Sequence, residues 1–553
     1  MPQKKNRSTN FLLHGSILAI AALITRVIGL LYRIPLINIV GSEGMAYYSS
    51  AFQIYNVILL ISSYSMPTAI SKMVSGRMAK KEFRNTARLF HLALLFAAVT
   101  GTLFGLLVFF GADWFAKWVL NLPLAAVAIR MLAPAIFIMA FLGVFRGFFQ
   151  GLQTTIPTAL SQLFEQIINA IVSVAAAYYL FQLGNKADLL NGNSEYGPAL
   201  GAAGGTLGTT IGALTALIFM LLVFLSFRKS FFRYARKDKK HVVESNKKLL
   251  QSLLVTILPI ILSTAAYNII DLVDNSIFGY YITGTSNASS YQKIWGTYTG
   301  MYMTLIHVPI SFSSALAASL MPSITAAMAE KNRGEVITKI NLAIKFAMLI
   351  AFPSAVGLAI LAEPLMSLMF SSSGSVKDAS LYLIMGSSSV VFMSLSTVTN
   401  AILQGINKMR SPVNHALISL CIHVAVMAVL LWVFDMGIYG VIFAYIVFAV
   451  SMCTLNTLTL NHALNVSQRW AKNYILPFLA AVMMGIATYA GRVGLAPLHM
   501  RNLVTVPLCL IVAVIVYAVS LFLFRAVDEL ELYDFPMGGR IVRLAKKLHL
   551  LKS

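Results

Sequence analysis

The chain has 553 residues, of which 58% are hydrophobic and only 11% are charged, and its formal net charge is +23. Soluble domains carry about 25% charged residues, so this composition excludes a water-soluble fold and predicts a polytopic membrane protein. In a soluble protein this charge would suggest a nucleic acid partner. In a membrane protein it indicates basic cytoplasmic loops, so we expect no nucleic acid partner.

Fourteen apolar segments are long enough to cross a bilayer, which takes about 20 residues per helix. They lie near residues 11–40, 43–66, 87–111, 124–148, 157–183, 197–227, 250–282, 297–325, 340–362, 378–405, 412–434, 437–460, 473–491 and 502–524. Because the number is even, both ends of the chain fall on the same side of the membrane. We therefore expect an all-α polytopic membrane protein with 14 transmembrane helices.

The distribution of basic residues agrees with this number of helices. If the N-terminus is cytoplasmic, 32 of the 42 lysines and arginines fall in inner segments or at inner helix ends, and six fall in outer segments. Cytoplasmic loops of membrane proteins carry such an excess of positive charge. We therefore predict that the N- and C-termini both lie in the cytoplasm.

The first predicted helix carries two full charges, Arg26 and Arg33, in the sequence ITRVIGLLYRIPL. A charge at the bilayer centre costs at least about 3 kcal/mol. The seven-residue spacing places both side chains on one helix face, about 10 Å apart along the axis. Two interpretations are open: each arginine pairs with a carboxylate of another helix, or the two form an anion site, since guanidinium groups match phosphate oxygens. Arg26 is expected near mid-bilayer, whereas Arg33, nearer the outer surface, has the further option of snorkelling.

Three more charged residues lie inside predicted helices. Glu165, about eight residues into the fifth helix, is either a partner for Arg146 or another cytoplasmic base, or a polar residue of a cavity. Arg130 and Lys345 lie close to the ends of their helices. We expect both to snorkel towards the membrane surface.

The seventh predicted helix carries Asp271 and Asp274, which are three residues apart and therefore on one face. Three interpretations are open: an outer gate of arginine–aspartate pairs, a cation or proton coupling site, or a plain pair at a helix end. In the eighth helix, His307 beside Pro309 is either a polar cavity residue or a hydrogen-bonded packing histidine.

Two short motifs recur along the chain. The Met-Pro pair at 66–67 returns 255 residues later at 321–322, and the Gln-Gly pair at 150–151 returns 254 residues later at 404–405. Two matches at nearly one offset indicate an internal repeat whose matched helices have the same orientation. We therefore predict a parallel repeat of six helices about an axis along the membrane normal.

The repeat suggests a division into domains. We predict an N-lobe at 1–227, a basic linker at 228–249, a C-lobe at 250–460, two further helices at 461–524 and a basic amphipathic tail at 525–553. The linker is either a solvated loop near anionic lipid or a site for a partner. Two parallel lobes favour alternating access around a central site. The sequence has no nucleotide loop, metal cluster or catalytic constellation, so we expect a monomeric transporter and not an enzyme.

These motifs resemble those of the MOP exporter superfamily, and within it those of the polysaccharide-biosynthesis, SpoVB-like and MurJ-like lipid II flippases. The resemblance is carried by TRVIGLLYRIPLINIVGSEGMAYY (25–48), SMPTAISK (65–72), FRGFFQGLQTTIP (145–157) and LMPSITAAM (320–328). It spans the whole chain and implies the V-shaped fold of that superfamily, with residues 461–524 forming a groove for a lipid tail.

The resemblance also implies roles for particular residues. Arginines in a central cationic cavity are essential in MurJ-like proteins, and one lies in a Ser-Arg-x-x-Gly pattern. TRVIG matches this pattern, which assigns the role to Arg26. A second arginine of the family falls on Tyr32, beside Arg33. An arginine and a glutamate before a proline in the family's eighth helix fall on Thr304 and His307.

The function that the resemblance implies is a flippase of the bacterial plasma membrane for a polyprenyl-diphosphate-linked sugar, with lipid II as the expected substrate. The alternatives are a flippase for other lipid-linked oligosaccharides and a cation-coupled multidrug exporter. Some relatives bind sodium, for which Asp271 or Asp274 could serve. We expect no cofactor, membrane lipids as partners, and a drive from the membrane potential or from a coupling cation, Na⁺ or H⁺.

Overall fold

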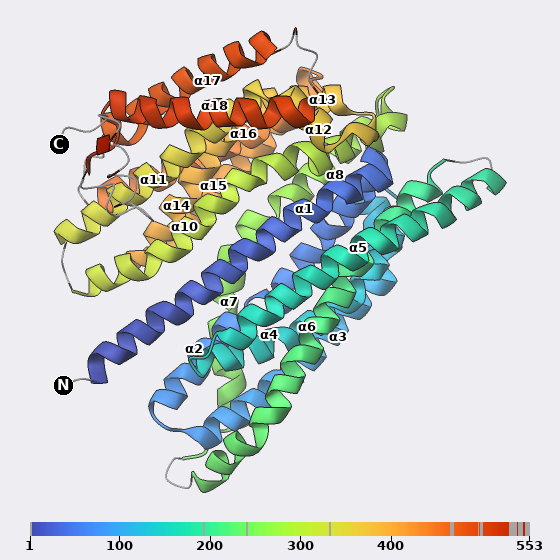
Figure 1. Cartoon of the computed structure of the whole chain (residues 1–553). Helices are drawn as coiled ribbons and strands as arrows, with labels where there is room; N and C mark the ends of the chain where they lie inside the picture. Colours follow the sequence, from blue (N-terminus) through green and yellow to red (C-terminus); the bar gives the residue numbers. More distant parts are fainter. Residues whose placement is uncertain are drawn as a thin grey trace. The chain divides into compact units, whose positions relative to one another are not determined.

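The computed structural model describes residues 3–191, 194–238, 242–330, 333–464, 469–495, 497 and 501–529, together with Gly539, Arg543, Lys546 and Lys547. Within these ranges every regular element is helical (Figure 1). The chain divides into two compact units, Met1–Gly300 and Met301–Ser553. Most of the predicted basic tail at 525–553 lies outside the described residues.

The first unit contains nine α-helices. They are α1 (Gln3–Leu59), α2 (Met66–Ala79), α3 (Phe83–Trp114), α4 (Ala125–Gly151), α5 (Ile156–Asn191), α6 (Tyr196–Lys237), α7 (Asn246–Asn268), α8 (Ile270–Thr283) and α9 (Tyr291–Gly296). Wider π-helical turns follow three of them, at Leu60–Tyr64, Phe115–Val119 and Thr297–Tyr302. A short 3₁₀ turn, Ala288–Ser290, precedes α9.

The second unit contains the remaining described helices. They are α10 (Met303–Ala329), α11 (Arg333–Ile360), α12 (Ala362–Met369), α13 (Val376–Gly386), α14 (Ser389–Gly405), α15 (Arg410–Ala428), α16 (Ile438–Leu464), α17 (Leu476–Leu495) and α18 (Asn502–Leu523). π-Helical turns occupy Val429–Val433 and Ala471–Ile475, and a 3₁₀ turn occupies Ser371–Ser373.

Ten helices among the described residues are long and apolar enough to cross a membrane, or eleven if the bent pair α13 and α14 counts as one span. The two helices of this pair meet at 53°. The prediction of an all-α polytopic membrane protein is confirmed in this form. The number of fourteen helices and the two six-helix lobes stay predictions.

The first two predicted helices form a hairpin that turns at Gly41. Its backbone is not helical there, with φ 70° and ψ −179°, a conformation that glycine adopts more readily than other residues. A straight helix would separate Tyr32 and Tyr48 by about 24 Å along its axis. Their hydroxyl groups instead lie 2.8 Å apart, so the two halves of α1 run antiparallel.

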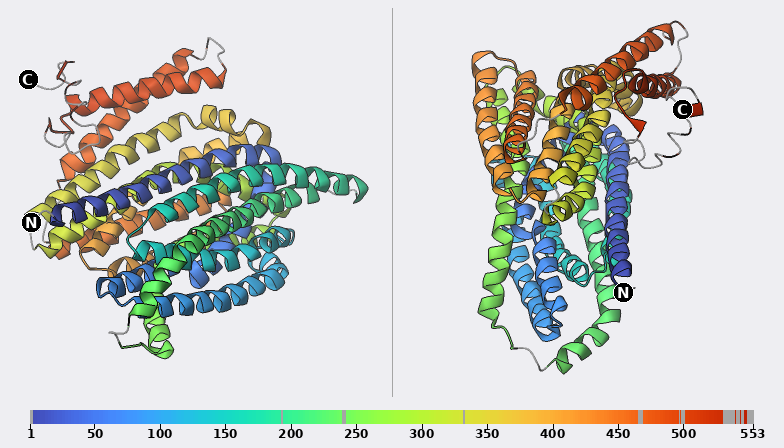
Figure 2. Two further views of the ribbon diagram at one scale, coloured as in Figure 1. Left: turned by 60° about the horizontal axis from the view of Figure 1, so that its bottom comes forward. Right: turned by 90° about the vertical axis from the view of Figure 1, so that its left-hand side faces the viewer.

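The helices α5 and α6 pack most closely where α6 carries a stripe of glycines. A Cβ added to Gly204, Gly208 or Gly212 would lie less than 3.0 Å from atoms of α5. Small residues at this spacing let two helix backbones approach in a membrane. Figure 2 shows α5 and α6 side by side along much of their length, so the stripe serves packing.

The two Gln-Gly motifs end their helices with the same local geometry. α4 ends at Gly151 and α14 at Gly405, and each is followed by a left-handed residue, Gln153 (φ 62°) and Asn407 (φ 65°). In both, the left-handed residue donates its N–H to the carbonyl three residues back, and the next residue donates to the carbonyl five residues back. This is the Schellman pattern of helix termination, and it supports the sequence repeat.

The predicted linker is more helical than expected. α6 continues to Lys237, ten residues beyond the predicted end of its span at 227. The aromatic residues Phe231 and Phe232 explain the extension, because Phe231 is buried and Phe232 packs against the same apolar cluster. The Phe231 ring lies 5.2 Å from that of Phe148 in α4. Helical spacing of apolar residues within a basic segment therefore holds the helix together past the predicted membrane edge.

Candidate functional site

The two arginines of α1 lie within the membrane-spanning part of the first helix of the hairpin. Measured along the helix axis from the turn at Gly41, Arg33 is about 12 Å and Arg26 about 22 Å away. Both distances are smaller than the hydrocarbon thickness of about 30 Å. The Arg26 side chain is exposed on the surface of the first unit, and Arg33 is half-buried.

The helix α5 packs beside the arginines of α1. A Cβ added to Gly29 would lie 3.3 Å from the side-chain nitrogen of Gln166. Gly29 follows Arg26 by three residues and precedes Arg33 by four, so Gln166 lies at a depth between the two charges. The neighbouring residue Glu165 therefore occupies the same level of the first unit, which sequence reasoning did not place beside α1.

The Glu165 carboxylate belongs to an ion pair. The Arg146 guanidinium of α4 donates a hydrogen bond of 2.6 Å to the Glu165 carboxylate and another of 2.9 Å to Ser161. Arg146 is buried, and a buried charge needs such a partner. Of the two interpretations, the pairing with Arg146 is confirmed, and the carboxylate still lies close enough to act electrostatically on Tyr55.

A row of aromatic residues lines the second half of the hairpin. Tyr48, Phe52 and Tyr55 have helical spacing, with ring centroids 4.7 Å apart for the first pair and 5.8 Å for the second. Tyr48 shares a hydrogen bond of 2.8 Å with Tyr32, the residue directly before Arg33. The row therefore runs from the level of Arg33 to that of Glu165. Its 4–3 spacing in the sequence was a detectable signal that the prediction did not use.

The two aspartates of α8 have different surroundings. Asp271 is exposed, whereas Asp274 is 1% exposed, so they do not share an environment although they are three residues apart. Beside Asp274, the buried Asn275 amide donates to Ser50 at 2.8 Å and also to Gln53. Asn275 thereby joins α8 to the second half of α1, and nothing in the sequence pattern had singled it out.

The same amide has a third contact within the first unit. The Tyr291 hydroxyl of α9 lies 2.7 Å from the Asn275 side-chain oxygen and 2.8 Å from the Leu120 carbonyl. Three elements, α1, α8 and α9, therefore meet at one buried asparagine. This polar hub fixes the position of Asp274 relative to the hairpin that carries Arg26 and Arg33.

Three of the remaining predicted residues belong to the second unit. Thr304 is buried and His307 is exposed, and both belong to α10 of the second unit. The expectation that Lys345 snorkels is wrong: it is 2% exposed within α11. A position close to the end of a predicted helix suggests exposure at the membrane surface. The sequence does not show which other helices cover that face. Arg130 is part-exposed and pairs with Asp113.

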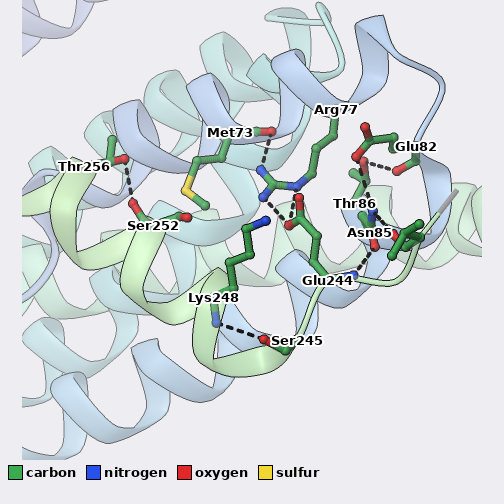
Figure 3. Close-up of polar contacts among 11 residues, drawn as sticks. Met73, Arg77, Glu82, Asn85, Thr86, Glu244, Ser245, Lys248, Ser252 and Thr256 are labelled. Atoms are coloured by element: carbon green, nitrogen blue, oxygen red, sulfur yellow. Dashed lines mark hydrogen bonds and ion pairs between the residues drawn. The ribbon is translucent and has the colours of Figure 1, made fainter.

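The segment before α7 is held on the α2–α3 turn (Figure 3). Two nitrogens of Arg77 donate to the Glu244 carboxylate, at 2.5 and 3.2 Å. The Asn85 amide donates to the Val242 carbonyl at 3.0 Å and accepts a bond of 3.1 Å from the Glu244 backbone. We call these contacts the linker clamp. It attaches the segment before the N-terminal end of α7 to the turn between α2 and α3.

No group of three or more His, Cys, Asp or Glu side chains suited to a metal ion occurs in the part of the chain that the structure describes. The arrangement around α1 instead offers guanidinium groups beside a largely buried row of aromatic residues. Guanidinium forks bind carboxylate and phosphate oxygens bidentately. The two guanidinium groups are therefore of the chemical type that recognises anions.

Known protein families and individual proteins match this chain over much of its length. The family model described as "Polysaccharide biosynthesis protein" matches residues 12–328, and the model described as "MatE" matches residues 259–430. The chain is 25% identical over 537 residues to Stage V sporulation protein B of Bacillus subtilis (strain 168), covering 96% of this chain and 98% of that protein. It is 25% identical over 429 residues to Lipid II flippase MurJ of the same organism, covering 76% of each.

Solved structures share the fold. A multidrug resistance MATE family transporter of the MOP superfamily, in an inward-facing conformation, matches with a TM-score of 0.65 at 16% identity, over 81% of this chain and 98% of that one. Lipid II flippase MurJ in an inward closed conformation matches with a TM-score of 0.63 at 15% identity, over 92% of this chain and 98% of that one. The family models and the two Bacillus subtilis relatives confirm the resemblance to the MOP exporter superfamily, and the solved structures share its fold.

Proposed function

Because the chain belongs to the polysaccharide biosynthesis protein family, we propose that it is a flippase that carries a polyprenyl-diphosphate-linked sugar from the inner to the outer leaflet of a bacterial plasma membrane. The observation that carries the proposal is the pair Arg26 and Arg33 on one face of α1, within the membrane-spanning part of the helix. The substrate's diphosphate is the charged group that has to cross the hydrocarbon. Its oxygens suit the two guanidinium groups.

The surroundings of the arginines support this role. Glu165 lies at their level and pairs with Arg146 at 2.6 Å, so positive charge outweighs negative charge among these four groups. A site for cationic drugs should instead present acidic or aromatic groups without fixed positive charge. The largely buried aromatic row Tyr48, Phe52 and Tyr55 stabilises the hairpin that carries the arginines, and the arginines provide the attraction for phosphate. A multidrug exporter is therefore the weaker alternative.

We propose lipid II as the substrate, with other lipid-linked oligosaccharides as the alternative. One relative is named a lipid II flippase, and this favours the first. The relative named Stage V sporulation protein B is matched over a larger share of both chains. This match favours other lipid-linked oligosaccharides as the alternative substrate. In either case the headgroup enters from the cytoplasm and leaves outward by alternating access, and the lipid tail remains in the membrane.

The test is complementation of a bacterial strain depleted of its own lipid II flippase, with a chemical assay of which leaflet holds lipid II. The wild-type chain should restore outward movement. Arg26→Ala should abolish it, because the anion site then loses one of its two guanidinium groups, while the protein still reaches the membrane. Arg26→Lys should restore it only in part, because lysine keeps the charge but loses the bidentate fork.

Arg130→Ala serves as the matched control, because Arg130 is a part-exposed arginine that pairs with Asp113. It should complement fully. Full complementation by Arg26→Ala would contradict the anion site. An unchanged distribution of lipid II with altered drug efflux would contradict the substrate class and favour the exporter. Failure with lipid II but success with another lipid-linked oligosaccharide would favour the alternative substrate.

A further inference from the structure

A cavity of about 440 Å³ lies in the first unit, away from the arginines of α1. Three regions line it: the π-helical turn Leu60–Tyr64 with the start of α2, the middle of α3, and α7. Its lining residues are Ile61, Ser62, Ser63, Ser65, Met66, Phe96, Thr100, Phe104, Leu254, Val255, Ile257 and Ile261. Ligand pockets of proteins have volumes of this size.

The cavity opens towards the surroundings of the helix bundle. Val255 at its rim is 66% exposed, and Ile61 and Leu254 are also exposed. The hydroxyl of Ser62 bonds to that of Ser63 at 2.9 Å, which leaves the wall that these two residues present largely apolar. Because the elements around it are predicted membrane spans, the medium at this rim is hydrocarbon. An apolar chain from the bilayer therefore suits the cavity.

A basic residue precedes the cavity residues on α3. Phe96, Thr100 and Phe104 line the cavity, and Arg88 lies eight residues before Phe96, a little over two helical turns away. Arg88 lies about 12 Å along the axis from Phe96. It is half-buried and donates a hydrogen bond of 2.8 Å to Asn246 at the start of α7. The charge therefore lies at one end of the groove between α3 and α7.

The α7 wall shows the same arrangement. Residues seven apart share a helix face, and Lys247 shares its face with Leu254 and Ile261 of the cavity. Lys248 is related in the same way to Val255. Both lysines are exposed and lie about 10 Å along the axis from the cavity residues. Positive charge at one end and an apolar cavity at the other match the two ends of an anionic lipid.

We propose that this groove binds one anionic phospholipid of the surrounding bilayer. Its phosphate lies at Arg88 and Lys247, and one acyl chain extends along α3 and α7 into the cavity. A zwitterionic lipid with the same chains would gain little from the basic end, whereas each basic residue attracts an anionic surface by about 1 kcal/mol, or roughly fivefold in affinity. The lipid would hold α7 against α3, next to the linker clamp, and the site does not depend on which substrate is transported.

Native mass spectrometry of the purified full chain in mild detergent tests the site. Phosphatidylglycerol and phosphatidylcholine with identical palmitoyl and oleoyl chains are the probes. The wild type should retain one phosphatidylglycerol with an affinity at least about tenfold above that for phosphatidylcholine. The double variant R88Q/K247Q should reduce retention of phosphatidylglycerol to the level of phosphatidylcholine. V255W, which blocks the rim from an exposed position, should reduce retention of both lipids.

Two control variants match these changes. K186Q/K293Q removes two exposed lysines from predicted outer segments, and L103W adds the same tryptophan at an exposed position of α3 that does not line the cavity. Both should retain lipid as the wild type does. Each variant is first checked for a monodisperse elution profile, and K247Q alone, at an exposed position, replaces the double variant if R88Q/K247Q does not fold.

Several outcomes would overturn the proposal. Equal retention of the two lipids by the wild type would remove the headgroup site, as would undiminished binding by K247Q and R88Q/K247Q. Normal binding by V255W would place the acyl chain outside the cavity. Displacement of phosphatidylglycerol by added lipid II would reassign the groove to the tail of a transported lipid. Absence of such displacement, together with loss in the charge and rim variants, supports a separate site.

Discussion

The hydroxyl groups of Tyr32 and Tyr48 share one buried hydrogen bond of 2.8 Å across the α1 hairpin. Sequence comparison had marked Tyr32 only as the residue that occupies a family arginine position. The structure gives it a structural role: it joins the helix that carries Arg26 and Arg33 to the aromatic row. Position 32 carries tyrosine where the family resemblance implies an arginine. Arg33 is therefore the second cation of this helix.

Single and double removal of these hydroxyl groups should have unequal effects. Tyr32→Phe or Tyr48→Phe leaves one buried hydroxyl without this partner, which costs about 1–3 kcal/mol of unfolding free energy. The double variant removes both groups and should cost no more than either single change. Denaturant unfolding in detergent measures the unfolding free energy of the wild type, the two single variants and the double variant. Tyr489→Phe, at an exposed position, is the control. Additive losses in the double variant would show that the bond contributes nothing.

The left-handed residues after α4 and α14 allow a prediction about helix ends. Gln153→Gly should raise the unfolding free energy by roughly 1 kcal/mol, because a left-handed conformation costs about 1–2 kcal/mol for a residue with a Cβ. Asn407→Gly should gain less, because asparagine tolerates this conformation better. Gln150→Gly, three residues earlier and inside α4, should instead lose about 1 kcal/mol. A change in unfolding free energy of the same sign for Gln150→Gly and Gln153→Gly would contradict the assignment of Gln153 to a left-handed helix cap.

The linker clamp predicts how the segment before α7 opens. Glu244→Arg places two positive charges together and should expose the backbone at Lys247 and Lys248 to trypsin, while the double variant R77E/E244R should restore protection. A charge-assisted hydrogen bond contributes about 1.5–3 kcal/mol, so cleavage should rise at least roughly tenfold. Asn85→Ala should increase cleavage without changing any charge, because it removes both contacts to the linker backbone.

Lys408→Gln provides the control for this experiment, since it removes a basic residue from a different exposed turn. Limited proteolysis followed by mass spectrometry identifies the cut sites. Unchanged cleavage at Lys247 and Lys248 in both the single charge variant and Asn85→Ala would show that the clamp does not hold the linker in solution.

At the scale of the whole protein, transport of a diphosphate headgroup should depend on membrane potential. Moving one charge through 100 mV is worth about 2.3 kcal/mol, and two negative charges leaving an inside-negative compartment gain about twice that. Collapsing the potential with valinomycin and external potassium should therefore slow outward movement of lipid II. Removing sodium at constant potential should leave the rate unchanged. The opposite pair of results would favour a coupling cation, with the buried Asp274 as the first residue to replace.

The sequence predicted the features that depend on local spacing and missed those that depend on packing. The turn between the first two helices, the two Gln-Gly helix ends and the pair Arg146–Glu165 follow from hydropathy, repeat offsets and charge. The Asn275 hub does not, because its partners Ser50 and Gln53 come from α1, far away in the chain. Lys345 was placed wrongly for the same reason, since covering helices leave no local signal.

The turn at Gly41 has a consequence for how the chain enters the membrane. Only a single non-helical residue separates the two halves of α1, so there is almost no hydrophilic loop to pass through the bilayer alone. The backbone groups at the turn also remain close to the helices on both sides of it. Residues 11–40 and 43–66 should therefore insert during synthesis as one unit. The ribosome must then release the second apolar segment before the two arginines of the first can leave the translocon and reach their final depth.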